Sequence, residues 1–267
     1  MKSAHGIGLR EVQAVYDGPE GRLWELIMGE QIHIGGFRSS MDLAERANIT
    51  PGAAGVDLCC CTGAGMRFLV RFRNVEKMHG VDATESIVEI GRNRCVAEGL
   101  ADRIAFSVAD ACETGLLADQ FDFVWGEDAW CYVADKEKLI REAARLVRPG
   151  GTIAFTDWVE GPAGLTDGEA DRFLRFMKFP NIEDVGGYRR LLVEYGCEVL
   201  TAEDTGRFAP HVDLYIEMLE RQLTYDALKI IGFDAEMLDH LAGEMKHMQQ
   251  LAHAGKIAQA VFIARNK

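Results

Sequence analysis

The sequence predicts an α/β fold in which a parallel, doubly wound sheet lies between helices. From residue 53 onward, apolar runs of strand length alternate with amphipathic stretches of helix length, and this alternation is typical of such a sheet. Three apolar runs end in an aspartate, at Asp57, Asp82 and Asp110. Because parallel strands end at one edge of a sheet, we expect these three carboxylates to lie together there.

Each element follows from a local pattern. Seven strands are expected, at residues 54–59, 77–82, 104–109, 121–126, 152–158, 197–202 and 257–265. The helix before the fifth strand carries Leu139, Ala143 and Leu146 at helical spacing, and Arg148–Gly151 then ends it. A further helix is expected near 184–195.

The ends of the chain are expected to cover the sheet edge. Residues 1–50 have apolar residues at helical spacing and precede the first strand. Residues 207–254 are mostly helical and too long for a simple connection. The expected organisation is an N-terminal helical cap at 1–50, a sheet domain at 51–206 and 255–267, and a helical lid insertion at 207–254. Covers at both places would enclose a small substrate.

Composition argues against several classes of function. The chain of 267 residues has 42 acidic and 29 basic residues, a net charge of -13 and no run of Lys or Arg, which argues against binding nucleic acid. No apolar run reaches the roughly 18 to 20 residues that span a bilayer, and the start of the chain lacks the apolar core of a signal peptide. We therefore expect a cytoplasmic protein with no membrane partner.

The cysteine pattern and the oligomeric state are less informative about function. The seven cysteines have no Cys-x-x-Cys spacing, so we expect free thiols and no metal site. A homodimer is open to the chain, although no residue pattern supports one.

The segment Ala54–Leu69 runs from an apolar strand through Asp57 into a turn of small residues that opens a helix. Backbone amides at such a helix N-terminus can approach a small polar ligand, because no bulky side chain stands in the way. Asp82, 25 residues after Asp57, stands where a strand end would hold ribose hydroxyls. The segment therefore indicates a nucleoside-binding site.

This pattern resembles the class I S-adenosylmethionine-dependent methyltransferases over about the first 160 residues. The resemblance implies a Rossmann-like sheet with an antiparallel last strand, and S-adenosylmethionine as cofactor. It implies that Asp57 is the acid of the first motif, that Asp82 binds ribose, and that Asp110 and Ala111 meet the adenine. Further cofactor-binding residues by the same resemblance are Gly35, Cys59, Cys60, Cys61, Gly63, Ala83, Gly126 and Glu127.

The first motif departs from the family at two positions. Cys59 and Cys61 stand where the family usually has glycine. A cysteine is small enough for close backbone approach, but a turn that needs a positive φ would be strained at Cys61.

A segment after the fourth strand, Trp125–Val133, is similar to sarcosine/dimethylglycine and phosphoethanolamine N-methyltransferases. Asp128 and Ala129 match that group, whereas Tyr132 stands where those enzymes have histidine. The resemblance implies that Asp128 and Tyr132 line the reaction chamber.

An upstream segment, Tyr16–Phe37, contains the pattern Gly-Glu-x-x-His-x-Gly, which those enzymes share with tocopherol methyltransferases. By that resemblance Tyr16, His33, Gly35 and Gly36 line the reaction chamber. His211 and Lys256 agree with the same group as scattered positions.

Methyl transfer from S-adenosylmethionine requires few catalytic groups, because the sulfonium already activates its methyl. The protein mainly has to position the acceptor and the methyl group. A base is needed only if the acceptor arrives protonated, and the candidates are His33, His211 and Tyr132. Asp128 could hold an ammonium group, and the rings of Trp130 and Tyr132 could face a methylated cation.

The leading prediction is methyl transfer to a small molecule through an amine nitrogen of the glycine, sarcosine, dimethylglycine or ethanolamine type. A carbon or oxygen acceptor in an isoprenoid, aromatic or sugar natural product is the close alternative, and the sequence leaves that choice open. An Arg or Lys beside an aromatic cage would favour an amino-acid amine, and an apolar slot a lipidic acceptor.

Two other classes remain. A nicotinamide-dependent oxidoreductase is disfavoured, because the first two glycines of Gly-x-Gly-x-x-Gly are missing at the first turn. The other is a binding protein without activity. In such a protein Cys59, Cys61 and Tyr132 would be substitutions that accompanied the loss of methyl transfer.

Overall fold

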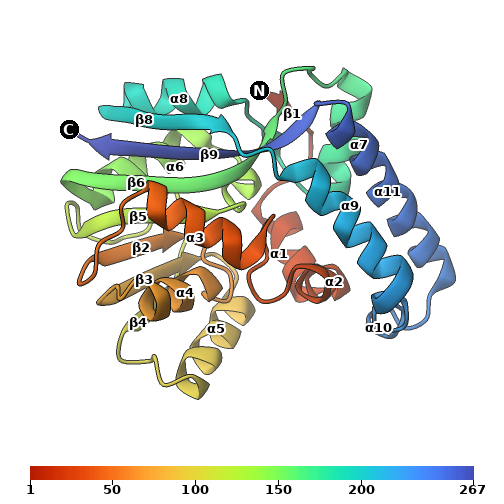
Figure 1. The fold of residues 1–267 in the computed structure, drawn as a ribbon, viewed down its shortest axis with the longest axis horizontal. Coiled ribbons are helices and arrows are strands. Elements are labelled where there is room, and N and C mark those ends of the chain that lie inside the picture. The colour runs from red at the N-terminus through yellow and green to blue at the C-terminus, as the bar shows by residue number, and fades with distance from the viewer.

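The computed structural model describes residues 1–267, and its centre is a seven-stranded sheet with helices on both faces (Figure 1). The strand order is β4-β3-β2-β5-β6-β9-β8, in which β2 to β6 pair in parallel and β9 is antiparallel to both of its neighbours. The strands are β2 (Ala54–Leu58), β3 (Lys77–Asp82), β4 (Ile104–Val108), β5 (Phe121–Glu127), β6 (Val147–Glu160), β8 (Cys197–Asp204) and β9 (Ile257–Asn266). The predicted fold class is therefore confirmed.

The helices around the sheet are α3 (Gly36–Arg46), α4 (Ala64–Phe72), α5 (Glu85–Ala97), α6 (Lys136–Leu146) and α8 (Val185–Glu194). Alternation along β5 shows how the sheet separates two cores. Val124 packs with residues of α6 and α8, whereas Phe123 and Trp125 pack with residues of α3 to α5. This alternation is the period of two that a strand buried on both faces requires.

Helices from both ends of the chain lie beside the sheet edge at which the parallel strands end (Figure 1). They are α1 (Leu9–Asp17) and α2 (Pro19–Met28) from the start, and α7 (Asp167–Met177), α9 (Phe208–Met218), α10 (Thr224–Ile230) and α11 (Ala235–His253) from later segments. One turn of π-helix, Leu219–Leu223, joins α9 to α10. No helix is both long and apolar enough to cross a membrane.

Two details differ from the sequence expectations. The expected start of the fifth strand at residue 152 is wrong, because β6 begins at Val147, where it pairs with Phe121 ahead of a register shift. A small sheet of β1 (Lys2–Ser3) and β7 (Asn181–Ile182) was not expected, and two-residue strands have no periodicity that could reveal them.

The turn between β2 and α4 carries backbone strain. Cys59 and Cys61 have φ values of 63° and 48°, in the left-handed region, and Gly63 follows with a φ of 74°. A side chain at Gly63 would collide with the ring of Phe106, because an added Cβ would lie 2.7 Å from it. The strain expected at Cys61 is present, and Cys59 shares it.

We predict that Cys61→Gly raises the free energy of unfolding by about 0.5 to 1 kcal/mol. Relief of a left-handed cysteine is worth about 1 to 2 kcal/mol, and the extra freedom of glycine in the unfolded chain offsets part of it. Guanidinium denaturation measures the change. Cys60→Gly is the control, because Cys60 is buried and has no positive φ, so this variant should lose stability. A Cys61→Gly protein less stable than the parent would contradict the strain.

Candidate functional site

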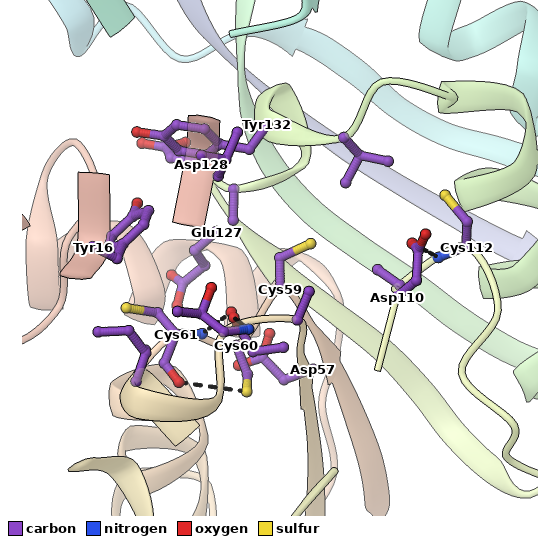
Figure 2. Close-up of a pocket in the computed structure, with 18 of the residues that line it drawn as sticks. Tyr16, Asp57, Cys59, Cys60, Cys61, Asp110, Cys112, Glu127, Asp128 and Tyr132 are labelled. Carbon is purple, nitrogen blue, oxygen red and sulfur yellow. Dashed lines mark hydrogen bonds between the residues drawn. The ribbon is translucent and has the colours of Figure 1, made fainter. Parts of the chain in front are cut away.

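A cavity of about 680 Å³ opens where β2, β3, β4 and β5 end (Figure 2). Asp57, Asp82 and Asp110 all line it, so the structure brings the three strand-end carboxylates to one site. Thirteen predicted site residues line this cavity: Tyr16, His33, Asp57, Cys59, Cys60, Cys61, Asp82, Ala83, Asp110, Ala111, Glu127, Asp128 and Tyr132. The other predicted site residues, Gly35, Gly63, Gly126 and His211, do not line it.

Asp82 links the turn after β2 to the turn after its own strand, β3. Its Oδ2 accepts a hydrogen bond of 2.9 Å from the Cys61 amide, and its Oδ1 accepts one of 2.9 Å from the Thr84 amide. Burial raises the pKa of Asp82, and the amide hydrogen bonds oppose that shift. Each oxygen keeps a further acceptor position, so the carboxylate can also receive two hydroxyl groups of a ligand.

Asp57 is buried and accepts no hydrogen bond from the chain. Its pKa is raised well above the usual range by burial and by the neighbouring charges of Glu127 and Asp82. A buried carboxylate without a donor is costly, and it indicates a site completed by a ligand. Asp110 accepts one hydrogen bond of 2.8 Å from the Cys112 amide through Oδ1, and its other oxygen accepts no hydrogen bond from the chain.

The thiols of the turn are not reactive groups. Burial raises the pKa of Cys61 to about 12 and those of Cys59 and Cys60 well above their usual range. All seven cysteines are free, as the sequence predicted, and no cluster of three or more His, Cys, Asp or Glu residues could hold a metal ion. In Figure 2 the sulfur of Cys61 points toward the side of the cavity where Tyr16 lies.

His33 is held by two polar partners. Its Nε2 lies 3.2 Å from Ser40 Oγ and 3.4 Å from Glu127 Oε1, and Ser40 donates a 2.7 Å hydrogen bond to the same Glu127 oxygen. The second oxygen of Glu127 accepts a 3.0 Å hydrogen bond from Trp125 Nε1. The Nδ1 atom of His33 is buried and has no partner in the chain. His33 is thus oriented through one ring nitrogen, while the other has no partner.

Asp128 ties three segments together. Its Oδ2 accepts a 2.8 Å hydrogen bond from the Ile34 amide, and Gln259 Nε2 of β9 lies 2.9 and 2.8 Å from its two oxygens. Gln259 also donates to the Ile34 carbonyl oxygen at 3.1 Å. Because these contacts occupy the carboxylate, its geometry favours holding the Ile34 loop over binding an ammonium group.

Tyr16 of α1 and Tyr132 both line the cavity (Figure 2), and their rings contact each other. Their ring centroids are 5.8 Å apart at an interplanar angle of 71°, and the ring of Phe179 packs against Tyr132. Burial raises the pKa of both phenols well above the usual range. Both are therefore protonated at neutral pH and can donate hydrogen bonds, but Tyr132 does not act as the base that the sequence left open.

Several other candidates have structural roles. Trp130 is fully buried, stacks on Phe155 and donates a 3.2 Å hydrogen bond to the Leu58 carbonyl, so it does not face a ligand cation. A side chain at Gly126 would collide with this indole, because an added Cβ would lie 2.4 Å from Trp130 Nε1. Lys256 pairs with Glu169 at 2.6 Å and lowers the pKa of that carboxyl to about 2.

His211 does not line the 680 Å³ cavity, and it lies beside Gly35 in the loop that precedes α3. Its Nδ1 is 2.8 Å from the Arg207 carbonyl oxygen, and its Nε2 would be 3.7 Å from a side chain added at Gly35. Gly35 has a φ of 88° and begins α3, so it shapes the loop that bears His33.

The basic residues of the cavity all come from α6. They are Lys138, Arg141 and Arg145. Lys138 pairs with Asp135 at 3.2 Å and Arg145 with Glu142 at 2.7 Å, on the side that adjoins the segment after β4. Lys136 donates to the carbonyl oxygens of Cys131 and Val133, on either side of Tyr132, and does not line the cavity.

Sequence reasoning missed Ser40 and Gln259. Gln259 could have been found, because it is the one polar residue in the apolar run Ile257–Ala264 and a polar residue inside a buried strand requires a partner. Ser40 lies on a helix with no pattern that distinguishes it.

Comparison with known proteins identifies the domain. A family model described as a methyltransferase domain matches residues 56–155. The methyltransferase GfsG of Streptomyces halstedii is 29% identical over 173 residues, which cover 63% of this chain and 61% of that protein. Phosphoethanolamine N-methyltransferase 1 of Arabidopsis thaliana is 23% identical over 246 residues, which cover 90% of this chain and 48% of that protein. The chain thus spans about half the length of several curated relatives that it matches.

Comparison of the fold with solved structures agrees with the methyltransferase domain match. A crystal structure of a putative sarcosine dimethylglycine methyltransferase from Galdieria sulphuraria superposes with a TM-score of 0.83 at 22% identity, over 93% of this chain and 98% of that one. The methyltransferase domain at residues 56–155, the strand order and the cavity at the strand ends together support a class I S-adenosylmethionine-dependent methyltransferase.

Proposed function

We propose that the protein transfers a methyl group from S-adenosylmethionine to a small-molecule acceptor, and that the acceptor atom is an amine nitrogen. The observation that carries this proposal is the convergence of Asp57, Asp82 and Asp110 on one cavity beside a turn of backbone amides. The curated relatives include N-methyltransferases of phosphoethanolamine and of glycine, sarcosine and dimethylglycine.

The residues present fit this cofactor. Asp82 keeps acceptor positions for two ribose hydroxyls, and Asp110 with Ala111 borders the place for the adenine. The unpartnered carboxylate of Asp57 suits an ammonium group, which would also relieve its desolvation. The cofactor, when bound, supplies an activated methyl on a sulfonium sulfur.

The acceptor is proposed to lie between Tyr16, Tyr132 and His33. The two phenols orient it by donating hydrogen bonds, and they cannot take a proton at neutral pH. An amine therefore either arrives with its lone pair free or loses its proton to His33, whose Nδ1 has no other partner. We infer that α1, α2 and the loop to α3 cover the chamber and exclude water.

A second candidate is an acceptor with an apolar body that is methylated on carbon or oxygen. A second cavity of about 340 Å³ favours it, because its lining is almost wholly apolar. This cavity lies between α2, α7 and the segment from α9 to α11, and Trp24, Leu241 and Ala242 are among its lining residues. Among the basic residues that line the first cavity, Lys138 and Arg145 already pair with acids, which disfavours acceptors that carry a phosphate or a carboxylate.

Transfer of radiolabelled methyl to a panel of acceptors tests the function and separates the two candidates. We expect labelled product from an amine without an anionic group, and little from phosphoethanolamine. In the Ala242→Trp variant, which fills the apolar cavity, an apolar acceptor should lose about tenfold in kcat/KM, whereas a small polar amine should lose nothing. A protein that binds the cofactor but labels no acceptor would contradict the proposal and favour a binding protein without activity.

We predict that Asp82→Asn weakens the binding of S-adenosylhomocysteine by about tenfold to a hundredfold, since a hydrogen bond to a charged group is worth about 1.5 to 3 kcal/mol. Isothermal titration calorimetry measures the affinity. Asp102→Asn is the matched control, because Asp102 is exposed and lies outside the cavity. Equal affinities for both variants would remove Asp82 from the cofactor site.

We predict that Tyr16→Phe lowers kcat by about tenfold or more and leaves the affinity for S-adenosylhomocysteine unchanged, because only a hydrogen bond to the acceptor is lost. Steady-state kinetics and calorimetry on one preparation measure both quantities. Tyr225→Phe, at an exposed tyrosine, is the control. A loss of cofactor affinity in Tyr16→Phe would show that this phenol contacts the cofactor instead.

A further inference from the structure

Two arginines contact Thr62 in the turn between β2 and α4, which we call the cofactor turn. Arg67 of α4 donates a 2.6 Å hydrogen bond from Nη1 to the Thr62 carbonyl oxygen, and Arg94 of α5 donates one of 3.3 Å from Nη1 to Thr62 Oγ1. Thr62 is buried and lines the cofactor cavity. The two guanidinium groups therefore help to set the shape of the turn.

The same guanidinium groups bind two acids of the cap segment, which we define as residues 9–35. Arg94 Nη2 donates to Glu25 Oε1 of α2 at 2.5 Å. Arg67 Nη2 donates to Glu30 Oε2, and Arg94 Nη1 lies 3.8 Å from that oxygen. Glu25 and Glu30 come from the N-terminal segment, whereas both arginines belong to helices that follow strands of the sheet.

The arginines of this cluster are more shielded from solvent than Glu30. The Arg67 side chain is 5% exposed, those of Arg94 and Glu25 are 25% and 32% exposed, and that of Glu30 is 53% exposed. Salt screens such partly buried, hydrogen-bonded pairs less than exposed ones. Arg67 has one further acid, Glu98 at 2.9 Å, but Arg94 has no acid outside the cap segment.

The loop that follows Glu30 forms a wall of the cofactor cavity. Glu30, Gln31, Ile32 and His33 line the cavity, and the loop lies between Gly29 and Gly35, which both have positive φ values. At its far end the Ile34 amide donates to Asp128. The ion pairs with Arg67 and Arg94 hold its near end, where no other side chain of the sheet domain contacts Glu30.

We propose that Arg67 and Arg94 are positioning residues that couple closure of the cap segment to the shape of the cofactor turn. Displacement of the cap segment would remove Glu25 and Glu30 from guanidinium groups that also hold Thr62. Docking of the cap segment restores these contacts and braces the turn around the bound cofactor. The inference rests on the proposed cofactor site and assigns a role to Glu30 in the Gly-Glu-x-x-His-x-Gly pattern.

Dissociation of S-adenosylhomocysteine tests this coupling without any acceptor. Stopped-flow measurement with Glu25→Gln, Arg94→Gln and the double variant should show dissociation about tenfold faster in each single variant. The double variant should match Arg94→Gln, because loss of the Arg94 guanidinium already breaks its pair with Glu25. Arg94→Lys keeps the charge and should recover part of the loss. Hydrogen exchange at residues 19–35 should rise in the same variants.

Arg92→Gln is the matched control, because Arg92 lies on α5 and pairs with an acid of its own helix, Glu89, at 3.6 Å. It should leave the dissociation rate unchanged. Dissociation rates that match the parent in all Glu25 and Arg94 variants, or single effects that simply add, would overturn the coupling while leaving the cofactor site intact. Failure of the unmodified protein to bind S-adenosylhomocysteine would instead overturn the proposed function, and this inference with it.

Discussion

The turn between β2 and α4 is the constraint on which the rest of the site depends. Its amides can approach a ligand only if the chain leaves the strand abruptly, and the left-handed conformations of Cys59, Cys61 and Gly63 achieve this. The strain is stabilised from several sides: the Val81 carbonyl accepts the Cys59 amide at 2.8 Å, Asp82 accepts the Cys61 amide, and two arginines hold Thr62. A strained turn of this kind persists only where its surroundings determine it.

The second organising feature is a set of buried polar side chains that joins distant segments. Asp128 at the end of β5, Gln259 in β9 and the Ile34 backbone share four hydrogen bonds, and each partner would be left unsatisfied if another were lost. His33 follows from this arrangement, because the loop that Asp128 holds at Ile34 presents its imidazole to Glu127 and Ser40. The loop before α3 and the last strand of the sheet thus hold Asp128 and His33 in place beside the cavity.

Much of the fold and of the candidate site was predictable from the sequence, because these features depend on residues that are close together in the chain. Strand periodicity and strand-end aspartates predicted the sheet and the cluster of Asp57, Asp82 and Asp110, because each depends on neighbouring residues only, whereas the early start of β6 at Val147 depends on its pairing with Phe121. The role of Trp130 could not be predicted from its neighbours in the sequence, because its burial depends on Phe155 and on the Leu58 carbonyl of another strand. The same holds for Arg67 and Arg94, whose acidic partners come from the cap segment.

A crystal structure with S-adenosylhomocysteine tests the central claim most directly. The account predicts the ribose hydroxyls on the Asp82 carboxylate, the adenine beside Asp110 and Ala111, and the cofactor sulfur facing Tyr16 and Tyr132. A nucleoside bound away from Asp82, or a sulfur that faces another side of the cavity, would contradict it.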